Sequence, residues 1–352
     1  MSVDARIGVR LGSLDLDLPL RAADGEVVAV LGPNGAGKTT GLRALAGLLR
    51  LTSGHVRVDG AAWAEGASTH LDPALRRVGL LSADHLLFPH LSVRDNVAFG
   101  PRSRGVDRRE ARTRALAELE ALDALELAAL RPSALSHGQA QRVAMARALA
   151  TDPRLLLLDE PLAALDPELR PRVRATLAAR LRGYAGSTIL VTHDPLDALT
   201  LADRLIFVES GRVVQSGTPV EVIARPRDAY VAQVVGLNLY AGEAADGETV
   251  TTALGPVVTA AHDHTGASWV AFPPSAVSLY RDHPSGSPRN TWPLVVEAVD
   301  LAGQSARVRA MAPGGAAVVA DVTTASVATL RLHPGEPVWA SVKATEVIAY
   351  PR

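Results

Sequence analysis

The sequence predicts an α/β layer fold over residues 1–235, followed by a small all-β region, an OB-like barrel, over residues 236–352. Three observations support this prediction. A chain of 352 residues has room for about two domains. In its first two thirds, short apolar runs alternate with Ala-, Leu- and Arg-rich stretches of helical periodicity. After Gly236 that periodicity fades, and apolar and polar residues alternate over 306–310 and 338–342.

Composition narrows the class of protein. The chain is 47% hydrophobic, so it can bury a sizeable core, and its formal net charge is -1. That balance argues against binding nucleic acid by neutralising its phosphates. Cysteine is absent, which excludes disulfides, thiolate metal sites and cysteine nucleophiles and fits a reducing compartment. No apolar run reaches about 18 residues and no signal peptide is visible, so we expect any membrane role to come through a partner.

The elements of the first region follow in order. Strands are expected at 5–11, 14–18 and 26–31, the last of which leads into a glycine-rich loop and a helix at 39–49. Helical pattern dominates 107–150, broken at Pro132 and Ser133, and a helical subdomain is expected at about 85–152. Further strands are expected at 155–158, 187–192 and 204–209. The first of these is a continuous apolar run, which indicates burial on both faces.

The glycine-rich loop matches G-x-x-x-x-G-K-[ST] from Gly32 to Thr39. A strand before it and a helix after it form the context in which this pattern cradles phosphates; the alternative is a glycine-rich turn that happens to precede a lysine. Lys38 is expected to reach the β- and γ-phosphates, and the Thr39 hydroxyl to bind Mg²⁺. The residues expected to contact nucleotide here are Gly32, Pro33, Asn34, Gly35, Ala36, Gly37, Lys38, Thr39 and Thr40.

A pair of carboxylates ends the apolar run at 155–158. Asp159 and Glu160 are therefore expected at the carboxyl edge of a strand, where open α/β sheets bind ligands. Asp159 is expected to hold Mg²⁺, and Glu160 to orient and deprotonate the attacking water. An ordinary strand end followed by a helix cap is the alternative.

The segment Leu-Ser-His-Gly-Gln at 135–139 resembles the signature of the ATP-binding-cassette (ABC) ATPases, usually LSGGQ. Leu165-Asp166 resembles their D-loop, and His193 resembles their switch histidine, although a lone histidine is more often structural. As an ordered set over about 1–235, these motifs indicate a P-loop NTPase cassette.

The resemblance implies a mechanism. Two cassettes pack head to tail with ATP and Mg²⁺ between them, and Ser136, Gly138 and Gln139 of one contact the γ-phosphate held by the other, with Asp166 also at the nucleotide. Glu160, His193 and Lys38 are then the catalytic residues, and hydrolysis is phosphoryl transfer to water that drives a membrane partner.

Three positions depart from the family pattern. His137 replaces the first glycine of the signature. Ala83 stands where the family has a glutamine that touches Mg²⁺ and water, and alanine has no polar atom with which to do so. No aromatic residue precedes Trp63, so the ring that commonly stacks on adenine is missing, and Val9 or Leu11 is expected to replace it at weaker affinity.

The second half divides into a β linker or regulatory segment at 236–286 and a further β domain at 287–352, with a linker at 282–288. The segments at 287–290, 320–326 and 342–347 resemble the molybdate-binding module, which implies a Mop- or TOBE-like domain at 287–352. Arg or Lys, hydroxyls and backbone N–H groups suit a tetrahedral dianion. The alternative is ordinary barrel surface. The expected oxyanion ligands, from two subunits, are Ser287, Arg289, Thr323, Ser326 and Lys343.

Together these resemblances imply the ATP-hydrolysing subunit of a bacterial importer for molybdate or a similar oxyanion such as tungstate. It is expected at the cytoplasmic face of the membrane, bound to permease subunits and a second copy of itself, with an extracytoplasmic oxyanion-binding protein delivering cargo and no nucleic acid involved. Alternatives are the same machine for sulfate, ferric iron, polyamine or sugar, a soluble non-transport ABC ATPase, and a catalytically weak oxyanion-responsive regulator.

Two further motifs have simpler interpretations. The arginine-rich stretch at 102–114 is interrupted by Asp107 and Glu110, which favours a solvated face over a nucleic-acid or lipid site. Docking of the permease, which the family resemblance implies for the helical subdomain, is a third interpretation. His262 and His264 have no third ligand at a plausible spacing, which favours a turn over a metal site.

Overall fold

A computed structural model describes residues 2–352. Contacts between Cα atoms divide the chain into two compact units, the first ending at Val222 and the second comprising Ile223–Arg352. Each has a hydrophobic core of its own. The division falls before the boundary expected at 235.

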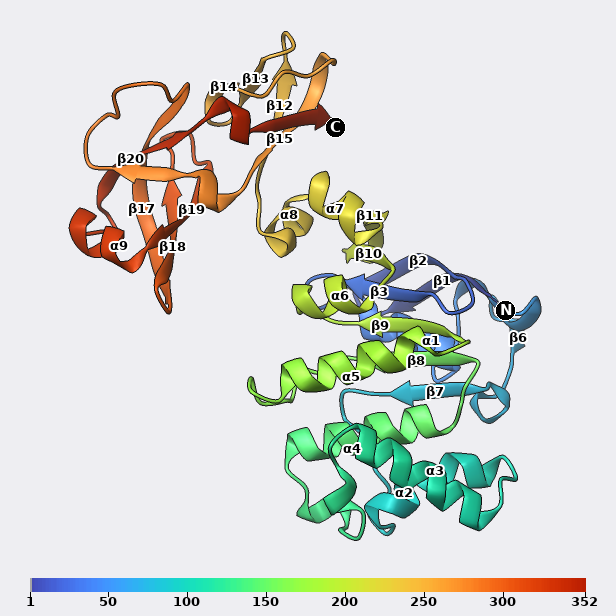
Figure 1. Cartoon of the computed structure of the whole chain (residues 1–352). Coiled ribbons are helices and arrows are strands. Elements are labelled where there is room, and N and C mark those ends of the chain that lie inside the picture. The colour runs from blue at the N-terminus through green and yellow to red at the C-terminus, as the bar shows by residue number, and fades with distance from the viewer. Residues whose placement is uncertain (1) are drawn as a thin grey trace. The chain divides into compact units, whose positions relative to one another are not determined.

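The first unit is built on an eleven-stranded sheet of order β6-β5-β4-β1-β2-β11-β10-β3-β9-β8-β7 (Figure 1). Strands β10, β3, β9, β8 and β7 pair in parallel. The strands are β1 Val3–Leu11, β2 Leu14–Ala22, β3 Val27–Leu31, β4 Ser53–Val58, β5 Ala61–Glu65, β6 Thr69–His70, β7 Val78–Leu81, β8 Leu155–Asp159, β9 Ser187–Val191, β10 Arg204–Glu209 and β11 Arg212–Gly217.

The strands expected from apolar runs are confirmed. Every residue of β3, β8 and β9 is buried, as a strand covered on both faces requires. Strands β1 and β2 instead alternate, with Arg6 and Asp17 on the solvent side and joined by an ion pair of 2.8 Å.

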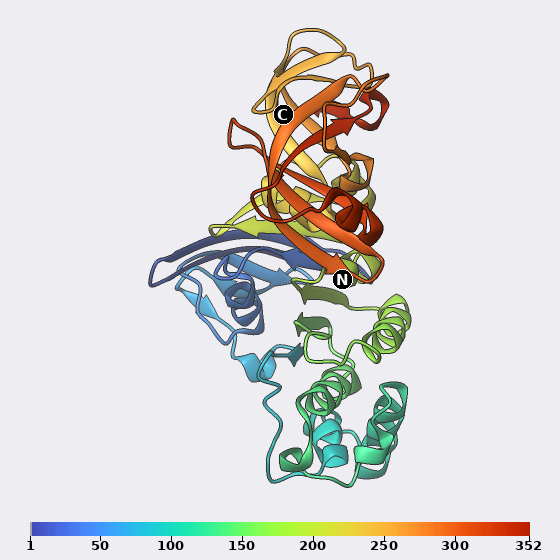
Figure 2. The same cartoon turned by 90° about the vertical axis from the view of Figure 1, so that its left-hand side faces the viewer.

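Helices cover the sheet or form a group beyond it. Helix α1 Lys38–Ala46 follows β3, while α5 Arg170–Arg182 and α6 Pro195–Leu201 follow β8 and β9. Helices α2 Val93–Ser103, α3 Arg108–Ala121 and α4 His137–Ala150 gather beyond the edge strand β7 (Figures 1 and 2) and form the helical subdomain.

Local sequence explains the helix ends. The side chains of Ser92, Asp107 and Ser136 cap α2, α3 and α4. The break expected at Pro132 is a 3₁₀ turn, Pro132–Ala134. Helix α1 ends earlier than the predicted 49, because Gly47 adopts a left-handed φ of 80° that closes it.

The second unit has two five-stranded sheets, of order β14-β13-β12-β15-β21 and β16-β20-β17-β18-β19. Helix α7 Pro219–Ala224 spans the division between the units, and α8 Ala229–Val235 precedes the sheets. The strands are β12 Asn238–Ala244, β13 Thr249–Thr252, β14 Gly255–Val258, β15 Gly266–Phe272, β16 Ser278–Tyr280, β17 Asn290–Ala302, β18 Ser305–Met311, β19 Ala317–Thr323, β20 Pro337–Val342 and β21 Ile348–Pro351, with α9 Thr324–Leu330 after β19.

The two segments of this unit exchange strands. From the later segment β21 pairs with β15, and from the earlier segment β16 pairs with β20. Their side chains share one core, in which the Phe272 ring stacks between those of Tyr240 and Trp292. The sequence expected as a linker at 282–288 lies in the loop between β16 and β17.

Candidate nucleotide-binding and hydrolysis site

Three neighbouring parallel strands bring the expected site residues to one edge of the sheet. Strand β9 lies between β3 and β8, with Val191 opposite both Val30 and Asp159. The chain leaves these strands into the glycine-rich loop at 32–37, into Glu160 and into His193. The carboxyl ends of parallel strands therefore place residues from three distant parts of the sequence side by side.

The glycine-rich loop depends on its glycines for shape. Gly37 caps α1 with a left-handed φ of 99°, which a residue with a Cβ rarely adopts. At Gly32 a Cβ atom would lie 2.1 Å from the carbonyl oxygen of Val208 on β10, so only glycine allows this approach. The loop therefore presents its backbone N–H groups and the start of α1 at the sheet edge, a geometry that suits phosphate.

Lys38 folds back over this loop. Its Nζ donates to the carbonyl oxygens of Gly32, at 2.7 Å, and Pro33, at 2.9 Å. Burial lowers the pKa of Lys38, although the carboxylates of Glu160 and Asp159 oppose that shift. The ammonium group thus lies between the loop and the two carboxylates.

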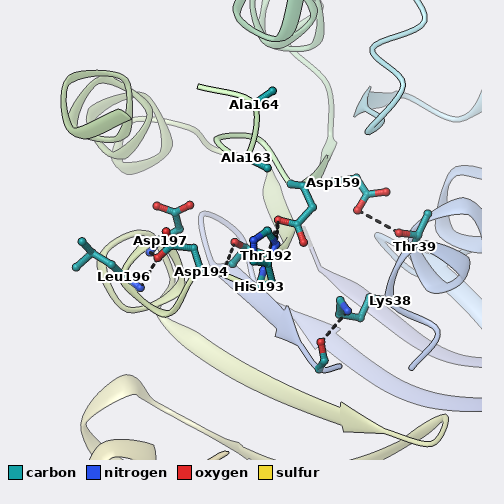
Figure 3. Close-up of polar contacts among 12 residues, drawn as sticks. Lys38, Thr39, Asp159, Ala163, Ala164, Thr192, His193, Asp194, Leu196 and Asp197 are labelled. Atoms are coloured by element: carbon teal, nitrogen blue, oxygen red, sulfur yellow. Dashed lines mark hydrogen bonds and ion pairs between the residues drawn. The ribbon is translucent and has the colours of Figure 1, made fainter. Parts of the chain in front are cut away.

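Thr39 and Asp159 meet across the site. The Thr39 Oγ1 hydroxyl donates to Oδ1 of Asp159 at 3.2 Å, and Figure 3 shows the two side chains facing one another. Burial raises the pKa of Asp159, while the bond from Thr39 opposes the shift. A hydroxyl and a carboxylate side by side are oxygen donors of the kind Mg²⁺ binds together with substrate phosphates.

Glu160 and His193 form a second pair beside the first. Nδ1 of His193 lies 2.9 Å from Oε2 of Glu160, and the backbone N–H of His193 donates to the same oxygen at 3.4 Å. Glu160 has a left-handed φ of 51°. Its backbone N–H donates to the carbonyl oxygen of Val191 at 2.9 Å. This turn separates the carboxylate of Glu160 from that of Asp159 and points it toward His193.

The signature segment, residues 135–139, lies at the start of α4. Ser136 and Gln139 form a capping box, in which the Ser136 Oγ accepts from the Gln139 N–H and the Gln139 side chain accepts from the Ser136 N–H. A Cβ at Gly138 would lie 3.0 Å from the carbonyl oxygen of Ala164, so the segment packs against the loop after β8. Asp166, on that same loop, is exposed.

Comparison with known proteins decides the family. Family models of the ABC transporter and of the TOBE domain match residues 16–163 and 286–349. The molybdenum import ATP-binding protein ModC of Mycobacterium tuberculosis is 44% identical over 349 residues, which cover 96% of this chain and 94% of that protein. The chain belongs to the ABC transporter ATP-binding family.

Two further relatives match this ABC ATPase over less of its length. The Fe(3+) ions import ATP-binding protein FbpC of Streptomyces coelicolor is 47% identical over 75% of this chain and 74% of that protein. A solved dimeric structure of the ATP-binding cassette MJ0796, in a post-hydrolysis state bound to ADP and Pi, is 28% identical. It has a TM-score of 0.55 and covers 62% of this chain and 99% of that chain.

The structure locates the three positions at which this ABC ATPase departs from the family pattern. Ala83 is exposed on the segment that follows β7. The ring of His137 contacts the ring of buried His85 on that same segment. Of the two residues expected at adenine, Val9 is buried in the sheet, whereas Leu11 is 57% exposed at the end of β1, so only Leu11 is available to a ligand.

The residues expected from the sequence to bind oxyanion fall into two groups. The hydroxyls of Thr323 and Ser326 lie 2.9 Å apart at the start of α9. Lys343 and Pro288, the neighbour of Ser287 and Arg289, instead line a pocket of about 310 Å³ with Ser341 and Glu346.

These two groups lie at opposite ends of β17. Its first residue, Asn290, pairs with Val342, and its last, Ala302, leads through Ser305 to Thr323. Thirteen residues of strand measure ~40 Å. A single oxyanion therefore cannot contact both groups of one chain.

Sequence reasoning missed two polar side chains that support the site. Buried Gln141 donates to the Glu160 carbonyl and accepts from the Ala164 N–H. Arg170 contacts both the Ala163 carbonyl and the Asp194 carboxylate, each at 3.2 Å. A glutamine at the start of the mainly apolar buried run of α4 was the available signal for the first.

The arginine-rich stretch and the His262–His264 motif lie outside the site, and their side chains contact nearby residues. Arg114 pairs with Glu110, and Arg112 lies 3.8 Å from Asp95, so the arginine stretch is partly neutralised. His262 and His264 contact each other through their rings, and among residues 2–352 no group of three acidic or histidine side chains is placed to hold a metal ion. No helix in that range is long and apolar enough to cross a membrane.

Proposed function

We propose that two copies of this ABC ATPase hydrolyse ATP between them and thereby energise import of molybdate, or of a similar tetrahedral oxyanion such as tungstate. The observation that carries the proposal is the convergence of Lys38, the Thr39–Asp159 pair and the Glu160–His193 pair at one sheet edge. These groups supply a phosphate clamp, ligands for a cation and a base beside an orienting histidine.

In this mechanism the loop N–H groups bind the phosphates, and Lys38 exchanges the Gly32 and Pro33 carbonyls for phosphate oxygens. Thr39 and Asp159 would hold Mg²⁺, which supplies neutralisation of phosphate charge. Glu160 takes a proton from water as the water oxygen bonds to the γ-phosphorus and the bond to the β–γ bridging oxygen breaks. His193 fixes the Glu160 carboxylate during that step.

The second copy supplies the rest of the nucleotide contacts. Ser136 and Asp166 are exposed, and Gly138 and Gln139 are partly exposed, so these groups are accessible to ATP held by another cassette. The start of α4 also favours an anion because of its dipole.

Trapping the dimer tests this arrangement. A Glu160→Gln chain with Mg²⁺ and ATP is expected to sediment as a dimer that retains two ATP molecules, while wild type returns to monomer as ATP is consumed. A nucleotide-saturated Glu160→Gln chain that stays monomeric with empty sites would overturn the proposal.

The cargo follows from the second unit. The alignment with the Mycobacterium tuberculosis molybdenum import protein covers 96% of this chain and so includes that unit. The alignments with the iron import protein and with the spermidine/putrescine import protein PotA of Pseudomonas fluorescens cover only 75% and 66% of this chain. Because its expected ligands lie at the two ends of β17, each oxyanion would be held by Thr323 and Ser326 of one chain with Arg289, Ser287 and Lys343 of another.

Calorimetry of the full chain with molybdate, tungstate and sulfate tests the cargo directly. We expect heat from the first two and little from sulfate, and loss of binding in Lys343→Ala. Equal binding of all three anions favours a general oxyanion regulator, and normal molybdoenzyme activity in a deletion strain without added molybdate would exclude the molybdate role.

The same proposal places the chain at the cytoplasmic face of a bacterial membrane, bound to permease subunits, with an extracytoplasmic binding protein delivering the anion. Purification of the tagged chain from detergent-solubilised membranes is expected to recover a permease. Recovery of ribosomes or DNA instead would favour a soluble ABC ATPase.

A further inference from the structure

Gln141 stands out among the buried residues of α4 because both ends of its amide are hydrogen-bonded to one loop. It belongs to a run of buried residues from Gln141 to Ala146, and only 3% of its surface is exposed. A buried amide needs partners for both its N–H₂ and its oxygen. Both partners lie on the loop that follows β8, far from Gln141 in sequence.

The two hydrogen bonds of Gln141 bracket this loop. Its Nε2 donates to the backbone carbonyl of Glu160 at 2.7 Å, and its Oε1 accepts from the backbone N–H of Ala164 at 3.0 Å. Figure 3 shows Ala163 and Ala164 on the loop directly beyond Asp159. One side chain of the helical subdomain thus fixes both ends of the turn that begins with Glu160.

That turn needs outside support. Glu160 has a φ of 51°, a left-handed conformation that a non-glycine residue keeps only where its surroundings fix it. Its N–H donates to the carbonyl of Val191 on β9 at 2.9 Å, and its carbonyl receives the bond from Gln141. The backbone of Glu160 is therefore held between the sheet on one side and α4 on the other.

We infer that Gln141 is a positioning residue for hydrolysis: through its bonds to the Glu160 carbonyl and the Ala164 N–H, it holds the Glu160 carboxylate at its place beside His193. The inference rests on the proposed role of Glu160 as the base. Gln141 itself has no contact with the reacting atoms and acts through the backbone of Glu160.

Replacing Gln141 separates positioning from folding. Gln141→Leu keeps the volume and removes both bonds, whereas Gln141→Glu keeps the acceptor for Ala164 and loses the donor to Glu160. The matched control is Met145→Leu, a buried residue of the same helix with no polar contact. We expect Gln141→Leu to lower kcat for ATP between about tenfold and a hundredfold with KM within about twofold.

A double-mutant cycle supplies the decisive readout. If Gln141 acts through Glu160, adding Gln141→Leu to Glu160→Gln lowers the single-turnover rate no further, because the base is already gone. Independent, multiplying losses in the double variant, or a Gln141→Leu effect equal to that of Met145→Leu, would overturn the inference. Wild type that binds no ATP, or Glu160→Gln with full activity, would instead contradict the proposed function.

Discussion

The imidazole ring of His137 meets that of His85 edge-on, with ring centroids 4.6 Å apart. His137 stands at a signature position that is glycine in the family, and His85 lies two residues after Ala83, where the family has glutamine. Two departures from the family pattern therefore lie on segments in direct contact. The His137 side chain joins the helical subdomain to the segment that follows β7.

Restoring glycine at His137 removes that contact. An aromatic pair contributes about 0.5–1.5 kcal/mol beyond its burial. We expect His137→Gly to lower the unfolding temperature by roughly 1–6 °C, since about 1 kcal/mol corresponds to 2–4 °C for a unit of this size. ATP turnover is expected to change little. Calorimetry of His137→Gly and of a His137→Ala control separates the lost ring contact, which both variants share, from the added flexibility of glycine. An unchanged melting temperature in both variants would contradict a stabilising ring contact.

The burial of His85 makes stability depend on pH. Burial lowers the pKa of His85, His137 and Arg147 lower it further, and Asp84 opposes them. The folded pKa thus lies below the ordinary value of about 6.5, so the unfolded chain binds more protons and stability falls as pH falls below about 6.5.

We expect wild type to lose more thermal stability than His85→Asn between pH 7.5 and 5.5. Asparagine tolerates the left-handed φ of 57° at this position and does not titrate there. Melting curves across this pH range give the slope of melting temperature against pH, and this slope is compared between wild type and His85→Asn. Parallel slopes would show that His85 titrates alike in the folded and unfolded chain.

Because alanine occupies position 83, we expect slow ATP hydrolysis that a glutamine at this position would accelerate. A glutamine at this exposed position would restore the polar atoms that the family places near Mg²⁺ and water. We expect Ala83→Gln to raise kcat by about threefold or more, roughly the worth of one modest hydrogen bond, with KM for ATP unchanged. Steady-state kinetics beside Ala83→Leu checks the polar origin of the gain, and equal rates for the two variants would count against it.

Because Leu11 is the residue expected at the base, we expect the protein to discriminate only weakly between ATP and GTP. Leu11, an exposed aliphatic side chain, is expected to contact the faces of adenine and guanine alike, because it lacks the ring that stacks and has no hydrogen bonds to offer. Titration is expected to give Kd values for ATP and GTP within about fivefold, and Leu11→Tyr is expected to tighten both by about 0.5–1.5 kcal/mol. Strong selectivity of wild type for ATP would mean that another residue reads the base.

Much of the first unit could be predicted because its signals are local. The uniform apolar runs of β3 and β8, followed directly by the loop at 32–37 and by Asp159, locate two buried strands and the groups at their ends without any knowledge of packing. Gly47 shows the limit of such signals, since its left-handed φ shortened a helix whose apolar pattern continues to Leu49.

The unpredicted features depend on contacts between distant residues. No local pattern pairs Gln141 with Glu160, because only the packing of α4 against the loop after β8 brings them together. The exchange of β16 and β21 between sheets was hidden for the same reason. The placement of Thr323 and Lys343 at opposite ends required the register of β17 with both its neighbours.

The hydroxyl of Tyr350, on the last strand, donates to the carbonyl of Pro226, near the start of the second unit, at 2.5 Å. The first and last segments of this unit consequently lie side by side. Such a module can be spliced into a surface loop of an unrelated host without stretching that loop.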